Sequence, residues 1–422
     1  MRAALAFLFV LSVSSPALAG YAPDFDRGVN VASAVEAALE AASSAGGLVP
    51  AASPRPADNP VWVTMEKREV TAMDDALFKR APVAQGEKVV VFEFRESELD
   101  QVSSSMMRSF SRAPGFFAHD TLESALADLR EPAPLPSRSY KADQPLRVNQ
   151  LLGLIKEETI VSNISALASY RNRYYKSATG IASSKWLQEL WGKFSEGRPD
   201  IKVEAFKHAS YPQESVILTI TGAVEPHKVV VLGGHLDSIA GSGDNPAPGA
   251  DDKASGIAVQ HAVIEAIVNS GYRPSKTLKF MGYAAEEVGL RGSADVAAAF
   301  KRDAVTVEGM LNLDMVNYKG STADIYFVSD NASAAQNAFL QKLVDTYTSY
   351  TWGVIKCGYA CSDHASWTKN GFPASMPFES KFNEYNPYVH KATDTLSVTG
   401  GRAEHALKFA KLAAAYAVEL AK

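Results

Sequence analysis

The second half of the chain alternates short apolar runs with longer helical stretches. Runs rich in apolar and β-branched residues, typical of strands buried in a sheet, occupy residues 216–221, 228–233, 278–285, 310–314 and 325–328. Helices are predicted between or beyond them, over residues 255–269, 293–300, 334–350 and 403–420. This alternation predicts a three-layer α/β domain, with a mostly parallel, mixed central sheet flanked by helices.

Two proline-rich stretches divide the rest of the chain. Residues 51–60 and 131–145 cannot continue a helix or a central strand and are predicted to be linkers, of which the second is the better domain boundary. The small piece between them shows a strand over residues 88–94 and a polar, helical stretch over residues 98–110. It contains no catalytic-looking cluster, and the larger domain begins after it, at about residue 147.

The first residues have the pattern of a secretory signal. Arg2 precedes an apolar run over residues 3–13, and Ala-Leu-Ala at 17–19 supplies the small residues that signal peptidase accepts. A membrane anchor would need about 20 apolar residues, and this run has about half of them. We therefore predict a signal peptide over residues 1–19 and a secreted protein, extracellular or periplasmic in transit.

In an exported chain, a small piece ahead of a larger domain suggests a propeptide. Residues 20–140 are accordingly predicted to assist folding or to cover the site of the larger domain, and then to be removed from residues 147–422. The alternative is a permanent accessory domain. The N-terminal residue of the exported protein distinguishes the two, because a start near Gly20 would refute removal.

Composition narrows the classes of partner and of metal site. The 422 residues carry 42 Lys plus Arg against 47 Asp plus Glu, a formal net charge of −5, and no run of five or more like charges. This balance argues against nucleic acid and membrane surfaces as partners. Cys357 and Cys361, the two cysteines, are too few for a cysteine-ligated zinc ribbon, so any metal must be held by His and carboxylates.

Polar residues gather where the predicted strands end, which is the edge at which α/β sheets bind ligands. His235 follows the strand at 228–233, and Asp237 lies two residues further on. Residues two apart in an extended segment project to the same side, so these two share an environment. Asp237 is expected to orient the His235 imidazole with its carboxylate or, because the two are so close in sequence, through local backbone geometry.

Carboxylates follow the other strands as well. Asp252 comes before the helix at 255–269, where it is either an N-cap, a role that Ser255 could also fill, or a ligand. Adjacent acids such as Glu286 and Glu287 repel each other at a strand end unless a cation or a proton compensates them. The remaining candidates end a strand or lie in a late loop: Asp314, His390 and Asp394. Two His and several carboxylates without Cys suit two zinc or similar divalent ions that share a bridging carboxylate.

These residues lie in six longer motifs, which are GHLDS at 234–238, PGADD at 248–252, AEEVGLRGS at 285–293, LDM at 313–315, CGYACSDH at 357–364 and MPFESKF at 376–382. Together the motifs resemble a known family, the secreted bacterial leucyl aminopeptidases with two co-catalytic zinc ions. They follow one another in the family's order, and the resemblance covers residues 151–422. Lys253 departs from it, because the best-known member has a third acid there.

The resemblance implies a role for each candidate residue. Asp252 would bridge two Zn²⁺ ions, with His235 and Asp314 completing one site and Glu287 and His390 the other. The catalytic residues would be Glu286, the general base, and Asp237, the carboxylate behind His235. A disulfide between Cys357 and Cys361 would lie beside an apolar pocket for the N-terminal side chain, lined by Met315, Val328, Tyr359, Phe378, Phe382 and Tyr385.

The implied function is a secreted zinc aminopeptidase acting as a monomer on peptides with a free N-terminus, Leu and other hydrophobic residues being preferred. Two metal ions would activate a water for attack on the scissile carbonyl. Other enzymes of the same fold, a carboxypeptidase or a glutaminyl cyclase-like acyltransferase, remain as alternatives. A binding protein without catalytic activity is the third hypothesis.

Overall fold

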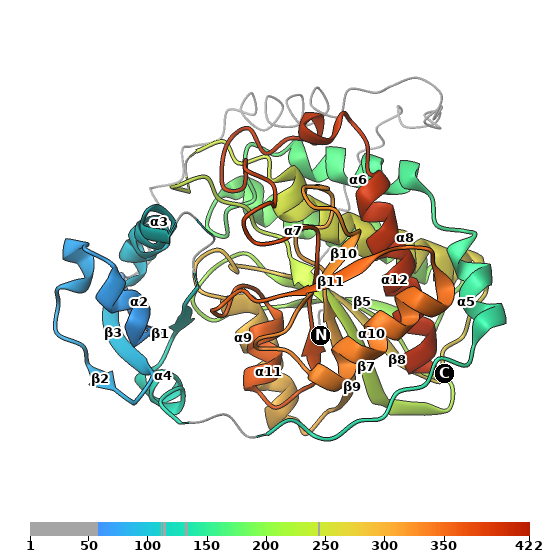
Figure 1. Cartoon of the computed structure of the whole chain (residues 1–422), viewed down its shortest axis with the longest axis horizontal. Helices are drawn as coiled ribbons and strands as arrows, with labels where there is room; N and C mark the ends of the chain where they lie inside the picture. The colour runs from blue at the N-terminus through green and yellow to red at the C-terminus, as the bar shows by residue number, and fades with distance from the viewer. Residues whose placement is uncertain (1–57, 111, 113–114, 131–133, 244) are drawn as a thin grey trace, which may run out of the picture. The chain divides into compact units, whose positions relative to one another are not determined.

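The computed structural model describes residues 58–110, 112, 115–130, 134–243 and 245–422, all of which belong to one compact unit, residues 52–422 (Figure 1). The predicted signal peptide and most of the first linker lie outside the described residues. No helix in the described part of the chain is long and apolar enough to span a bilayer.

A six-stranded sheet forms the centre of the larger domain. Its order is β12-β9-β7-β8-β6-β5, from Ala374–Ser375, Thr306–Asn312, Glu225–His235, Lys276–Tyr283, Ser215–Ile220 and Ile201–Phe206. The first four strands are parallel, whereas β6 and β5 are antiparallel to their neighbours. The predicted mixed, mostly parallel sheet is therefore confirmed.

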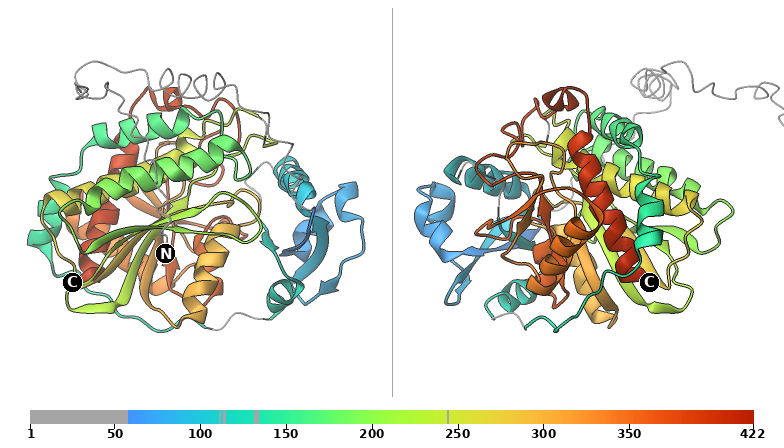
Figure 2. Two further views of the ribbon diagram at one scale, coloured as in Figure 1. Left: turned by 180° about the vertical axis from the view of Figure 1, so that it is seen from behind. Right: turned by 45° about the vertical axis from the view of Figure 1, so that its right-hand side comes forward.

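Alternating side chains of β7 divide the interior into two layers. Val230 and Leu232 face one core, and Val229 and Val231 face the other. Helices that contribute to the first core are α5 (Pro145–Leu152), α6 (Glu157–Ala168), α7 (Ala178–Gly192), α8 (Gly256–Asn269), α10 (Ala334–Tyr347) and α12 (Glu404–Ala421). The second core is covered by α9 (Arg291–Arg302) and α11 (His364–Lys369). Helices thus cover both faces of the sheet (Figure 2).

One predicted strand lies outside the central sheet. Residues 325–328 form β10 (Ile325–Val328), which pairs in parallel with β11 (Trp352–Ile355) and antiparallel with β13 (Pro377–Phe378). The open side of β9 is taken by β12, so β10 completes its backbone hydrogen bonds in this second sheet instead.

The described residues between 58 and 130, called the N-terminal module from here on, have their own sheet. Its order is β2-β3-β1-β4, from Ala84–Gln85, Val89–Arg95, Pro60–Glu66 and Phe117–His119, with helices α2 (Lys67–Ala72), α3 (Leu99–Phe110) and α4 (Leu122–Ala127). The predicted strand at 88–94 and helix at 98–110 are present as β3 and α3. Sequence analysis missed β1, because its first residue is a proline of the first linker. Removal of residues 20–140 stays a prediction.

Candidate metal centre

The ends of three neighbouring strands bring the candidate ligands together. His235 is the last residue of β7 and pairs in register with Tyr283, the last residue of β8. Glu286 and Glu287 follow β8 within a short turn, and Asp314 follows β9 in the same way. Because β8 and β9 flank β7, all of these side chains emerge at one edge of the sheet, as predicted.

Asp252 lies between the two candidate histidines. Its Oδ1 is 3.3 Å from Nε2 of His235, and its Oδ2 is 3.0 Å from Nε2 of His390. The residue is not the N-cap of α8, because that helix begins at Gly256 and its N-cap position is Ser255. A carboxylate with one oxygen toward each imidazole has the arrangement expected of a ligand shared by two ions.

The other carboxylates divide between the same two histidines. Nε2 of His390 is 2.7 Å from Oε2 of Glu287, whereas Nε2 of His235 is 3.5 Å from Oδ1 of Asp314 and 3.7 Å from Oε2 of Glu286. Potential ligand atoms lie within 4.8 Å of one another in two sets, His235–Glu286–Asp314 and His235–Asp252–Glu287. All six predicted residues therefore meet in one buried cluster.

Asp237 contacts His235 mainly through its backbone. Nδ1 of His235 lies 3.1 Å from the carbonyl oxygen of Asp237 and 3.5 Å from its carboxylate. The carboxylate instead accepts hydrogen bonds from the backbone N–H groups of Glu286, at 3.0 Å, and Glu287, at 3.2 Å. Asp237 thus fixes the turn that carries both glutamates as well as the imidazole.

Sequence analysis assigned no role to a group of buried residues behind Asp252. The carboxylate of Asp394 accepts a hydrogen bond from the backbone N–H of Asp252 at 3.0 Å and another from Asn386 at 3.0 Å. Burial, together with the neighbouring charge of Asp251, raises the pKa of Asp394 to about 8. In the sequence, the position of Asp394 four residues after His390 was the one feature that could have indicated its role.

Three residues around the cluster have left-handed backbone conformations that non-glycine residues rarely adopt. The φ angles are 53° at Ala285, which precedes Glu286, 49° at Met315, which follows Asp314, and 54° at His390 itself. Such conformations cost on the order of 1–3 kcal/mol each and persist only where the surroundings impose them. Their position next to the cluster is typical of a functional site.

A bound cation would compensate the buried carboxylates of the cluster. Burial, with the nearby carboxylates, raises the pKa of Glu287 to about 7 and that of Glu286 well above its usual range. Among the described residues, Oε1 of Glu287 and Oδ1 of Asp314 are buried without a hydrogen-bond partner. Imidazole and carboxylate ligands without cysteine fit zinc, so the residues present suit the predicted metal.

An apolar pocket adjoins the cluster. Its lining includes the predicted residues Met315, Tyr359, Phe378, Phe382 and Tyr385, and also Cys361, Met376 and Val389, which were not predicted. Val328 of β10 is fully buried in the same hydrophobic cluster but is not among the residues that line the pocket. That part of the pocket prediction is therefore corrected.

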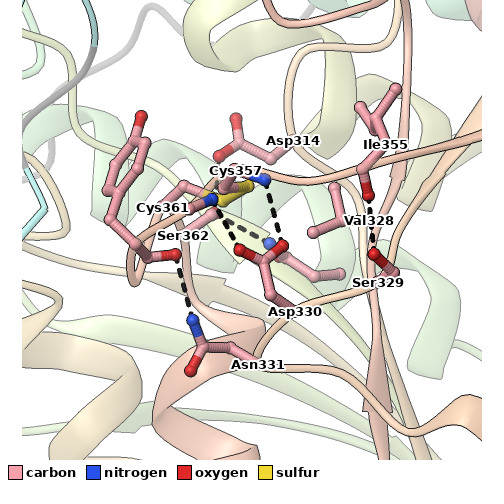
Figure 3. The surroundings of a disulfide bond; sticks show 12 residues. Asp314, Val328, Ser329, Asp330, Asn331, Ile355, Cys357, Cys361 and Ser362 are labelled. Carbon is pink, nitrogen blue, oxygen red and sulfur yellow. Dashed lines mark hydrogen bonds between the residues drawn. A yellow bond between two sulfur atoms is a disulfide. The ribbon is translucent and has the colours of Figure 1, made fainter.

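The predicted disulfide is present beside this pocket (Figure 3). Asp330 accepts a hydrogen bond from the backbone N–H of Cys357 at 3.0 Å, and Asn331 donates one to the carbonyl oxygen of Tyr359 at 3.0 Å. Next to the disulfide, the Ser362 hydroxyl donates to Asp314 at 2.5 Å. The loop thus holds both a pocket residue and a candidate ligand.

Two buried cations lie close to the site. Lys253, which is fully buried, donates to the carbonyl oxygen of Leu313, and its ammonium is 3.5 Å from Oδ1 of Asp314. A side chain at Gly234 or Gly256 would collide with Lys253, so these glycines make room for it. Arg173 donates to the carbonyl oxygens of Leu236, at 2.8 Å, and Gly249, at 2.9 Å.

Known proteins are similar to this chain in sequence and in fold. Residues 215–415 match the family described as Peptidase family M28. The chain is 36% identical to the probable leucine aminopeptidase of the fungus Trichophyton verrucosum, over 65% of this chain and 75% of that relative. The predicted resemblance to leucyl aminopeptidases is thus found with a fungal relative, whereas the sequence was expected to resemble the bacterial members.

Two solved structures from Legionella pneumophila are similar over a longer stretch. The LapA aminopeptidase superposes with a TM-score of 0.78 at 26% identity, over 86% of this chain and 98% of LapA. LapB gives a TM-score of 0.76 at 27% identity, over 86% of this chain and 100% of LapB. Residues 147–422 make up a smaller share of this chain than either match covers. Both matches therefore extend into the N-terminal module.

Proposed function

Because this chain belongs to peptidase family M28, we propose that it is a two-zinc aminopeptidase that removes hydrophobic N-terminal residues from peptides. The family match bears out the predicted enzyme class. The observation that supports the two-zinc centre is the position of Asp252, whose two carboxylate oxygens face His235 and His390.

The proposed ligands form two sites joined by Asp252. His235 and Asp314 complete one site, and Glu287 and His390 complete the other, so that each ion receives one imidazole and one carboxylate besides the shared one. Zinc bound there supplies a Lewis acid that polarises a carbonyl and lowers the pKa of water. The surrounding residues hold the ligands in place, since Asp394 fixes the backbone of Asp252 and Ser362 bonds to Asp314.

Glu286 is proposed as the general base. It lies next to the ligand Glu287, with its backbone held by Asp237, and burial raises the pKa of its carboxyl group well above the usual range. A base works best when its pKa is near the working pH, and the positive charge of bound zinc would act against the burial and lower this pKa. Glu286 would take a proton from the attacking water and deliver it to the leaving amine.

The pocket sets the preferred N-terminal side chain. Phe378 and Phe382 stack with their ring centroids 5.1 Å apart, and Tyr359 meets Phe382 edge to face at 6.3 Å. These rings and Met315 offer an apolar surface that suits Leu, Phe or Met. One methylene in such a pocket is worth about 1–3 kcal/mol, so the selectivity should be broad.

Export and assembly are further parts of the proposal. The sequence pattern over residues 1–19 supports secretion. A monomer is proposed, without nucleic acid or membrane as partners. The N-terminal residue of the exported protein, read directly, tests the position of the signal cleavage.

Metal content and a free-amine test distinguish the proposal from its alternatives. The purified protein should contain close to two zinc ions per chain, and it should hydrolyse Leu-p-nitroanilide much faster than the N-acetylated analogue. A carboxypeptidase would not need the free amine, a cyclase-like enzyme would hold one zinc, and a binding protein would turn over neither substrate. Equal rates on the free and blocked substrates would refute aminopeptidase action.

A further inference from the structure

The N-terminal module and the larger domain share one hydrophobic core. From the module, Val63, Phe92 and Leu99 pack in the same cluster as Tyr175 and Val288 of the larger domain. Each of these side chains is at most 2% exposed. Loss of the module would therefore uncover apolar surface next to the turn that carries Glu286 and Glu287, a liability in a soluble protein.

Buried polar contacts join the same two parts. Arg291, which is 2% exposed, donates to Glu96 and to Asp120 of the module, each at 2.8 Å. The Tyr175 hydroxyl also donates to Glu96 at 2.8 Å. The first turn of α9 is thus held by carboxylates that only the module supplies.

The module also contacts a proposed zinc ligand directly. The Ser103 hydroxyl on α3 donates to the backbone carbonyl oxygen of Glu287 at 2.6 Å, in a fully buried position. The backbone N–H of Ala118 donates to the carbonyl oxygen of Gly289 at 3.0 Å. Helix α3 and strand β4 therefore fix the loop that follows the two glutamates.

An outer cleft of about 590 Å³ leads from α3 to the metal centre. It shares Phe382, Tyr385, Val389 and His390 with the lining of the inner pocket. Arg108 and other residues of α3 line this cleft, but among the described residues none from the module lines the inner pocket. The module thus forms a wall of the approach, and its Arg112 lies over the ring of Tyr359, a residue of the inner pocket, at 3.4 Å from the ring centroid.

The charged residues that line the outer cleft are basic. They are Arg108 and Arg112 from the module and Lys391 from the loop after His390, and no carboxylate is among the described lining residues. Arg108 pairs with Asp75 at 3.4 Å, and Arg112 pairs with Glu69, but both acids lie outside the lining. Cationic groups on both sides of a cleft favour an anionic ligand between them.

Resting on the proposed aminopeptidase function, we propose, in place of the predicted removal of residues 20–140, that residues 58–130 stay in the working enzyme and form the basic wall that receives the peptide beyond the scissile bond. The preferred substrates are short peptides whose C-terminal carboxylate follows the scissile bond by one or two residues. LapA supports a retained module, because 98% of the LapA chain matches and the match extends into this region.

The substrate part is tested with Leu-Ala and Leu-Ala-amide, which differ only in the terminal carboxylate. The full-length exported enzyme should show a kcat/KM about twofold to fivefold higher for the free acid, the size expected of an exposed ion pair. The Arg108→Gln, Lys391→Gln double variant should bring this ratio close to one. The matched control Arg302→Gln, at an exposed residue on α9, should keep the wild-type ratio.

Retention is tested by intact mass and N-terminal sequencing of the active exported protein, whose chain should begin before residue 60. A fully active protein that begins after residue 130 would overturn the proposal, and so would a wild-type ratio of one between the two substrates. Absence of any hydrolysis of Leu-p-nitroanilide would instead refute the aminopeptidase function itself, so the two failures are distinguishable.

Discussion

The carboxylate of Asp237 accepts the backbone N–H of Glu286 at 3.0 Å. Since the same carboxylate accepts the N–H of Glu287 at 3.2 Å, one side chain sets the position of the proposed base and of a proposed ligand. Asp237→Ala should lower kcat about tenfold to a hundredfold, the usual effect of losing a group that orients metal ligands. Steady-state kinetics on Leu-p-nitroanilide measures the loss.

Asp237→Asn provides the matched control for this prediction. Its amide oxygen still accepts one of the two N–H groups, whereas its NH₂ group would face the other donor. The activity should therefore lie between those of the wild type and Asp237→Ala. Full activity in Asp237→Ala would contradict the role assigned to this carboxylate.

Glu286→Ala should retain two zinc ions but lose about a hundredfold to ten thousandfold in kcat, because it removes the proton acceptor without removing a ligand. Zinc is measured by mass spectrometry of the purified protein and kcat on Leu-p-nitroanilide. Glu287→Ala is the matched comparison, since this neighbour contacts His390 at 2.7 Å and its loss should lower the zinc content. A near wild-type rate in Glu286→Ala would remove Glu286 from the mechanism.

Lys253→Met should bind zinc more tightly and unfold more easily when zinc is absent. Burial raises the pKa of Asp314, but Lys253 and His235 outweigh this effect and hold the net pKa low. In the metal-free protein the ammonium compensates the buried acids, whereas with zinc bound it repels the ion. Calorimetric zinc titration and thermal unfolding in a chelator measure the two effects, and weaker zinc binding would contradict the prediction.

Arg173→Met should lower the free energy of unfolding by about 3 kcal/mol, because it leaves several buried carbonyl groups without a donor. The guanidinium is fully buried and supports the loop from Leu236 to Gly249. Chemical denaturation measures the change. Arg302→Met serves as the control, since Arg302 is 73% exposed and its replacement should change the stability by less than about 0.5 kcal/mol.

His261 should make the fold sensitive to acid. Burial lowers its pKa from 6.5 to about 4, so below pH 6.5 the unfolded chain binds a proton that the folded protein does not. Uncharged His261 therefore makes its full contribution to the free energy of unfolding above pH 6.5. This contribution is lost as the pH falls toward 4. Between pH 7 and pH 5 this loss amounts to about 2 kcal/mol.

His261→Phe removes that titration and keeps a ring against Phe194, whose centroid lies 5.1 Å from the imidazole. The variant should therefore lose about 2 kcal/mol less than the wild type between pH 7 and pH 5. Denaturant unfolding of both proteins in a chelator gives the comparison. Parallel stability curves would show that His261 does not titrate in this way.

The sequence by itself determined which residues lie at the ends of strands. The apolar runs before His235 and Glu286 form β7 and β8 because a buried strand needs such a run, and the acid after β9 is placed by the same rule. The fold class and the gathering of the ligands at one edge could therefore be predicted. The resemblance to a known family added the choice of Glu286 as base and the pairing of Cys357 with Cys361.

The tertiary structure alone decided how these residues pair. That Asp252 faces both His235 and His390, that Asp237 bonds to the turn after β8, and that Ser103 reaches Glu287 are contacts between segments far apart in the chain. Local patterns of apolar and polar residues fix the type and the ends of an element, but they carry no information on the packing of one element against another. For the same reason Val328 was predicted to line the pocket, although it is buried in the cluster around it and is not among the lining residues.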